Sequence, residues 1–141
     1  MQKIEFGVGF LVFMISFSFV IYSLLSFDHE KNESLEGEVL LETFLKNRGS
    51  PENWDSSDVE KIGLASSPNI LDKRKVEELM KMEYKDVKEI LRIKGDFRII
   101  LESESYKFTY GKEIPQQKSV KKFERPIIID NELGKFYLYY W

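Results

Sequence analysis

The sequence predicts an α+β protein in which a long N-terminal transmembrane helix precedes a small domain of two or three helices and an antiparallel sheet of about four strands. Three observations predict this class. An uninterrupted apolar run opens the chain, segments with helical periodicity follow, and alternating aromatic and β-branched residues fill the last third. We expect a transmembrane helix and membrane-exit stalk over residues 1–31, then an extracytoplasmic α+β head domain over residues 32–141.

The apolar run extends from Phe6 to Phe27 and contains 22 residues without a charge, Pro, Asn or Gln. A helix of that length rises about 33 Å, which exceeds the roughly 30 Å thickness of the hydrocarbon core of a bilayer. The run is about twice as long as the apolar part of a signal peptide, and no A-x-A-like cleavage site follows it. We therefore expect the uncleaved anchor of a single-pass membrane protein, in contact with membrane lipid.

The flanks of the run predict its orientation. Lys3 and the amino terminus form a weakly basic flank, whereas the stretch from Asp28 to Glu60 holds ten acidic residues against three basic ones. Positive charge favours the cytoplasmic side of a membrane, so we expect the N-terminus inside and the C-terminal domain outside. The acidic segment beside the membrane exit is expected to be repelled by anionic lipid headgroups.

The predicted transmembrane helix has two distinct stripes. Small residues recur every seven positions on one stripe, and phenylalanines between Phe6 and Phe17 form the adjacent stripe. Small side chains let helices approach closely in lipid, although Gly and Ser are common in membrane helices in general. The carboxylate near the start of the run either faces cytoplasmic water or pairs with a cation on a neighbouring subunit. The residues predicted to mediate helix packing and assembly are Glu5, Gly9, Phe13, Ser16, Phe17 and Ser23.

The segment after the run is polar. From Asp28 to Glu38 it either extends the membrane helix or forms a short stalk, and it contains an N-x-S sequon. Asn32 is therefore a predicted glycan acceptor near the membrane if the domain is outside. An apolar face over Val39 to Lys46 predicts a helix, which Gly49 and Pro51 are expected to stop.

Two further helices are predicted in the middle of the chain. Asp72 is a good N-cap for the first, which covers KRKVEELMKM. The second covers YKDVKEILRI, with Val87 and Ile90 on its apolar face. Upstream of both, the stretch from Val59 to Leu64 is predicted to be a short strand whose apolar side chains point to one side.

From Phe97 onward the hydrophobic period changes to that of strands, and turn sequences separate the segments. One turn is a predicted hairpin loop from Asp130 to Gly134. Pro126 lies inside a strand segment, which predicts an edge position or a bulge, because Pro cannot donate a ladder hydrogen bond. The last segment is apolar on both faces, which predicts either a central strand or a face covered by a partner. The four segments are FRIILESE, YKFTYG, VKKFERPIII and KFYLYYW.

Composition and motifs exclude several chemistries. The chain has no Cys and a single His, His29, so disulfides, thiolate catalysis and multi-histidine metal sites are excluded. Asp55 and Asp58 lack further ligands at calcium-loop spacing and are better explained as turn residues. No phosphate loop, nucleophile elbow or zinc motif occurs, and no basic stripe marks a nucleic-acid surface. We expect no enzyme activity, no catalytic residue, no metal and no cofactor.

The order of these features resembles type IV pilins and pilin-like proteins. In MQKIEF, Ile4 and Glu5 stand where mature members of that family have an apolar residue and their Glu. The segments from Gly49 to Leu64 and from Leu71 to Leu91, with a last hairpin ending at Trp141, look like archaeal membrane-anchored pilin-like proteins. The resemblance implies that N-terminal helices bundle into a filament core or a membrane-bound priming complex, with Glu5 paired to the amino terminus of a neighbour.

Two functional hypotheses follow. Precursors in that family carry a short basic leader ending in Gly or Ala, and none precedes Glu5 in this chain. The chain is thus either already trimmed or an unprocessed accessory subunit, and a minor component is favoured over a bulk filament subunit. The first hypothesis is a pilin-like subunit or accessory component of a cell-surface filament or its membrane assembly complex, in a homo- or hetero-oligomer. The second is a membrane-tethered extracytoplasmic module that binds a protein or envelope polymer through its sheet.

Overall fold

The computed structural model describes residues 2–141, except for the side chains of residues 2, 3, 29 and 30. The side chains of Lys3 and His29, which enter the expectations about orientation and metal binding, therefore lie outside the described part. The chain forms two compact units, Met1–Asn32 and Glu33–Trp141. Helix α1 (Gln2–Lys46) contributes residues to both units, so the polar segment after the apolar run is helical.

The second unit, hereafter the head, confirms the α+β class and corrects the details of the sheet. The four expected strands are present and antiparallel to one another. Two short strands extend the sheet to six, in the order β1-β2-β5-β6-β3-β4, and β2 runs parallel to β5. The two added strands have three and two residues, which is too short for a period-2 pattern to be visible in the sequence. The elements after α1 are β1 (Ala65–Ser67), β2 (Ile70–Leu71), α2 (Lys73–Lys81), α3 (Tyr84–Leu91), β3 (Phe97–Ser103), β4 (Lys107–Gly111), β5 (Lys121–Ile129) and β6 (Glu132–Tyr140).

The strand expected over Val59 to Leu64 is wrong. This segment makes one isolated bridge, between Lys61 and Ser50, and then bonds to the end of α1, where the Leu64 N–H donates to the Phe44 carbonyl at 3.1 Å. A Cβ on Gly63 would lie 2.2 Å from the carbonyl oxygen of Asn47. The glycine therefore lets two backbones approach closely, and the buried apolar residues around it pack against a helix end.

Strand β5 accommodates its proline because it has one neighbour at that point. Strand β2 pairs with β5 only at Ile128 and Ile129, so Pro126 borders β6 alone and its missing N–H removes no ladder bond. The hairpin from β5 to β6 turns through Asp130 and Asn131, whose φ values are 50° and 63°. This two-residue turn has the left-handed backbone of a type I′ hairpin and is shorter than the loop expected from the sequence.

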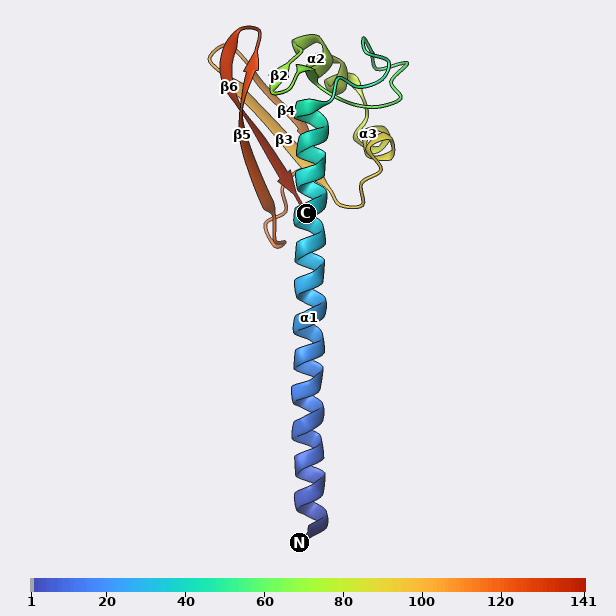
Figure 1. Ribbon diagram of the computed structural model, residues 1–141, viewed down its shortest axis with the longest axis vertical. Helices are drawn as coiled ribbons and strands as arrows, with labels where there is room; N and C mark the ends of the chain where they lie inside the picture. Colours follow the sequence, from blue (N-terminus) through green and yellow to red (C-terminus); the bar gives the residue numbers. More distant parts are fainter. Residues whose placement is uncertain (1) are drawn as a thin grey trace. The chain divides into compact units, whose positions relative to one another are not determined.

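The last turns of α1 lie at the centre of the core of the head and along one face of the sheet (Figure 1). Phe44 is fully buried, and its ring centroid lies 5.8 Å from that of Phe97 and 6.1 Å from that of Phe136. Alternate residues of β3 and β6 point toward this helix, as their period-2 pattern predicts. Helices α2 and α3 join the same cluster. Its most buried side chains from the helices are Leu40, Leu41, Phe44, Leu45, Val76, Leu79 and Val87.

Strand β6 is the central strand of the antiparallel part of the sheet, between β5 and β3. Its inner face is buried, whereas Tyr137 and Tyr139 on the outer face are half-buried. The ammonium of Lys122 lies 5.0 Å and 5.8 Å from the centroids of these two rings, within cation–π range. The central-strand interpretation explains the aromatic residues on both faces.

Candidate functional site

The part of α1 in the first unit is the main candidate. From Ile4 to Phe27 every side chain is exposed, and the large apolar side chains range from 42% exposed at Ile21 to 78% at Phe6. A helix that is apolar all round is typical of a membrane span. Among the described residues, α1 is the one helix long and apolar enough to cross a membrane.

The predicted packing residues lie on this open surface. A Cβ on Gly9 would meet nothing within 4 Å. The hydroxyl of Ser16 donates to the Val12 carbonyl at 2.9 Å, so its hydrogen bond is made inside its own helix. The rings of Phe13 and Phe17 stack with their centroids 6.0 Å apart. The remaining two predicted packing residues, which are also exposed, are Glu5 and Ser23.

The residues predicted to pack form a surface that a second helix can approach. The small residue at position 9 leaves the backbone accessible, and the hydroxyl at position 16 presents no unsatisfied polar group to lipid. Close approach at small residues is how helices associate in a bilayer, where dispersion forces and packing drive association. The structure therefore provides the geometry that helix packing requires, while the packing itself stays a prediction.

Two residues that sequence reasoning did not single out fasten α1 to the sheet. The Glu36 carboxylate accepts a hydrogen bond from the Lys94 N–H at 2.8 Å, and it lies close enough to the Tyr140 hydroxyl to affect its pKa. Burial and this carboxylate both raise the pKa of Tyr140. A Cβ on Gly37 would lie 2.6 Å from the ring of Phe123, so the helix and sheet meet closely there. A glycine inside a helical segment was the one available signal.

The end of α1 is held by a buried lysine. Lys75 is 2% exposed, and its ammonium donates to the carbonyls of Arg48 at 2.6 Å and Ala65 at 3.2 Å. Burial lowers the pKa of this ammonium. Arg48 lies in the segment that follows α1 and Ala65 is the first residue of β1, so the lysine joins two segments that meet beside the helix end. Lys75 is therefore a structural group.

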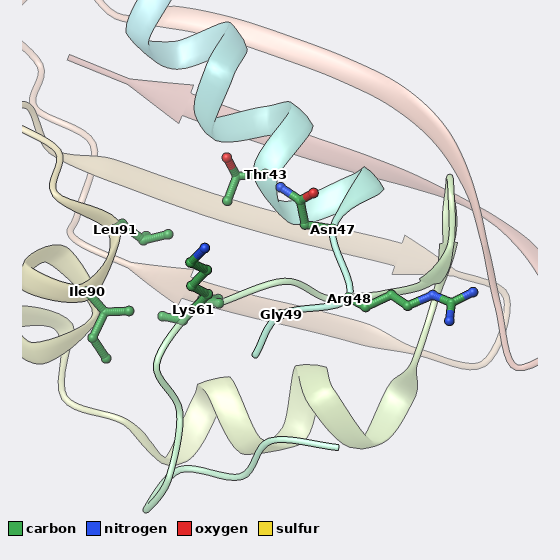
Figure 2. A pocket seen from close by; sticks show the side chains of 8 residues that line it. Thr43, Asn47, Arg48, Gly49, Lys61, Ile90 and Leu91 are labelled. Atoms are coloured by element: carbon green, nitrogen blue, oxygen red, sulfur yellow. The ribbon is translucent and has the colours of Figure 1, made fainter. Parts of the chain in front are cut away.

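A cavity of about 330 Å³ lies beside this helix end, between α1, the segment around Lys61 and α3 (Figure 2). Figure 2 shows Thr43 of α1 near Asn47, the residue just after the helix, with Lys61 and Leu91 opposite them. The Thr43 hydroxyl donates to the Val39 carbonyl at 2.8 Å, so it is already engaged. Lys61 is exposed. This arrangement points to no particular ligand.

The other residues considered from sequence have local roles. Asn32 is exposed on α1 and is the last residue of the first unit. Asp55 accepts hydrogen bonds from the N–H and the hydroxyl of Ser57, and Asp58 accepts one from the Asp55 N–H at 2.7 Å. The bonds from Ser57 lower the pKa of Asp55. This is turn chemistry, and in the described part of the chain no three His, Asp or Glu side chains come together to hold a metal ion.

Comparison with known proteins adds no information about the exposed segment of α1. Comparison of the chain with known protein families, with curated proteins and with solved structures found no match. The exposed segment of α1 and the surfaces of the head are therefore the observations from which function is inferred.

Proposed function

We propose that this is a single-pass membrane protein whose exposed α1 segment both anchors it and packs against other membrane-embedded helices. The observation that supports this most is the division of one helix into two environments. Residues 4–27 expose apolar side chains on every side, whereas Leu40, Phe44 and Leu45 of the same helix are buried in the head. Apolar surface of that extent is stable only against lipid or protein.

The assembly we favour is pilin-like: a subunit or accessory component of a cell-surface filament or of its membrane assembly complex. The small-residue stripe containing Gly9, Ser16 and Ser23 provides the close approach, and the adjacent Phe stripe provides area for dispersion contacts. In such an assembly Glu5 pairs with a cation or an amino terminus of a neighbour, since a carboxylate at the membrane needs a partner.

Substitution on the small stripe tests helix packing. Ser16→Leu is expected to reduce self-association of the full chain several-fold in membranes, measured by energy transfer between two labelled populations. Ser18→Leu is the matched control, because it makes the same change about 200° around the helix. Equal association of both variants and the wild type would show that the stripe does not pack. Equal losses would show that only the number of serines matters.

The proposed topology places the head outside the cytoplasm. Because the chain has no Cys, a Ser57→Cys variant carries a single reactive thiol on an exposed turn. A membrane-impermeant maleimide added to intact cells should label this thiol. Labelling only after lysis would place the head inside.

A binding module remains the second candidate, because the outer face of the sheet carries exposed apolar residues near the β5–β6 hairpin. Leu133 is 76% and Ile128 41% exposed, and a cavity of about 290 Å³ is lined by Leu133, Pro126 and Gly134. A partner that is captured by the Ser16→Leu chain and lost with Leu133→Ser would favour this module. Capture lost with Ser16→Leu alone would favour assembly through the helix.

A further inference from the structure

One end of the head, here called the base, comprises residues 92–98 and 112–122. The structure ties these two stretches together, since the Lys112 N–H donates to the Phe97 carbonyl at 3.0 Å. The base also includes the point where the backbone of Asp96 pairs with that of Trp141. Figure 1 shows the loop after α3 and the loop between β4 and β5 at the end of the sheet where the C-terminus lies.

The base concentrates positive charge in a chain whose net charge is −3. Its carboxylates are Asp96 and Glu113, against seven cations. Asp96 is already matched, because its oxygens lie 3.0 Å from the ammonium groups of Lys88 and Lys112. The cations of the base are Arg92, Lys94, Arg98, Lys112, Lys118, Lys121 and Lys122.

In the described part of the chain, most of the seven cations of the base form no ion pair. Among the described residues, no carboxylate lies within ion-pair distance of Arg92, Lys94, Lys118 or Lys121. Two carboxylates of α1 also lie at this end: Glu36 accepts a hydrogen bond from the Lys94 N–H, and Glu33 together with Glu36 raises the pKa of Tyr140. Arg92, Lys94 and Lys118 are exposed and Lys121 is half-buried, so these cations remain available to an external anion.

The same loops expose an apolar side chain. Ile114 is 38% exposed, and the half-buried Pro115 and Val120 flank the tip of the loop that carries Lys118. Lysines around an exposed aliphatic side chain form a surface suited to the boundary between lipid headgroups and acyl chains.

The chain itself keeps the base close to a membrane. The head begins at Glu33, and only residues 28–32 separate it from the apolar run ending at Phe27. Five residues span at most about 18 Å even when fully extended. The base is also the end of the head that receives α1, because the Lys94 N–H binds Glu36 there.

We propose that the base of the head binds the anionic headgroups of the membrane in which α1 is anchored. This inference rests on the proposed membrane anchor. Clusters of Lys and Arg beside a membrane span are attracted to anionic lipid, and the attraction decays over a Debye length of about 10 Å in 0.1 M salt. The base would thus offset the repulsion expected from the acidic segment next to the apolar run.

A fluorescence experiment on the full chain in lipid nanodiscs tests the proposal. A Ser119→Cys variant takes an environment-sensitive fluorophore on the loop of the base, and headgroup spin-labelled lipid quenches it on contact. We expect at least threefold more quenching in discs with 30% phosphatidylglycerol than in pure phosphatidylcholine, and loss of the difference in 1 M salt. The matched control is Glu104→Cys, in the turn between β3 and β4 at the opposite end of the sheet.

Charge reversal identifies the groups responsible. Lys118→Glu with Lys121→Glu should abolish the lipid-dependent quenching, whereas Lys61→Glu with Lys107→Glu changes the net charge equally and should leave it intact. Quenching that is the same in both lipids, or unaffected by the first pair, would overturn the proposal. Quenching that instead depends on the number of copies per disc would assign the base to a neighbouring subunit and would also overturn it.

A label at position 16 separates this inference from the proposed anchor. In a Ser16→Cys variant, a fluorophore within the bilayer is quenched by acyl-chain spin labels. If position 16 is quenched and position 119 is not, the anchor stands and the base inference fails. If position 16 is not quenched, the anchor fails and the base has no membrane to bind.

Discussion

The two parts of α1 have similar apolar content but opposite environments. Between Ile4 and Phe27 apolar side chains surround the helix and none is buried, whereas between Leu40 and Leu45 they occupy one stripe and are at most 2% exposed. A helix that packs on a sheet buries one side, so only one stripe of its surface is apolar. A helix in lipid contacts acyl chains on every side, so its whole surface is apolar. A residue type therefore does not reveal its role on this helix, but the distribution of residues around the axis does.

The same contrast applies to glycine. Gly37 lies against Phe123 and Tyr140, and a Cβ there would come within 3.3 Å of both. Gly9 meets nothing within 4 Å. One glycine lets a helix approach a sheet inside the head, and the other leaves space for a contact outside the described chain. Substitutions on the two parts of α1 should consequently affect different measurements.

The largest expected difference is between two phenylalanines. Phe44→Ala should reduce the free energy of unfolding of the head by about 3–5 kcal/mol, because it leaves a cavity between Phe97 and Phe136. Phe13→Ala should change it by less than about 0.5 kcal/mol, since this residue buries nothing in the described chain. Denaturant unfolding of the full chain in detergent, followed by the fluorescence of Trp54 and Trp141, measures both. Similar losses in the two variants would contradict the division of α1.

Substitution of Gly37 should affect the stability of the head, whereas substitution of Gly9 should affect self-association in membranes. Gly37→Leu is expected to destabilise the head by about 1–3 kcal/mol, because the added side chain overpacks the contact with Phe123. Gly9→Leu should leave unfolding unchanged and weaken self-association in membranes. A Gly37→Leu chain that unfolds like the wild type would mean that the ring of Phe123 moves aside without cost.

Acid should weaken the head and spare the apolar run. Burial opposes ionisation of Asp96, but hydrogen bonds from Lys112, Lys88 and Tyr84 outweigh it and lower its pKa below the ordinary 3.8. The unfolded chain thus binds this proton at higher pH than the folded head, so the stabilisation is complete above about pH 5 and is lost as the pH falls through the lowered pKa. The run from Phe6 to Phe27 contains no carboxylate, and its helicity should not change.

Asp96→Asn isolates this contribution from those of the other carboxylates. At pH 7 it should cost about 1–2 kcal/mol, because neutral hydrogen bonds replace charge-assisted ones. The difference in unfolding free energy between the wild type and the variant should shrink as the pH falls below about 4. A difference that stays constant with pH would mean that the Asp96 charge does not stabilise the fold.

The smallest expected effect is at the contact between α1 and the last strand. Glu36→Gln should cost about 0.5–1 kcal/mol, since a neutral acceptor replaces the carboxylate at the Lys94 N–H. The ionisation of Tyr140 followed by ultraviolet absorbance should shift to lower pH, because burial and this carboxylate together raise its pKa. An unchanged titration would remove Glu36 from the account of how the head holds α1.

Much of the secondary structure could be predicted, because its signals are local. Asp72 caps α2 through the Arg74 N–H, as its position before the helix predicts. The edge location of Pro126 also followed from its missing N–H. The strand expected over Val59 to Leu64 failed because apolar residues spaced for a sheet serve equally to cover a helix end.

The candidate site was predictable to the same limited degree. The apolar run and its small-residue stripe are visible in any reading of the first 27 residues. The role of Glu36 was not predictable from sequence. The residues that it affects, Lys94 and Tyr140, lie 58 and 104 residues away in sequence, and the sequence of a helix contains no pattern that predicts such a contact. The burial of Lys75 was likewise not predicted, because its acceptors on Arg48 and Ala65 are 27 and 10 residues away in sequence.

The sequence by itself determined that the chain begins with a helix fit for a bilayer and continues into an α+β domain, because hydrophobic length and period are properties of neighbouring residues. Only the tertiary structure decided where the charges gather. The acidic residues near the apolar run are contiguous in sequence, whereas the cations of the base come from two loops that strand pairing brings together. Local composition predicts repulsion from an anionic membrane, and the folded head presents a surface that attracts one.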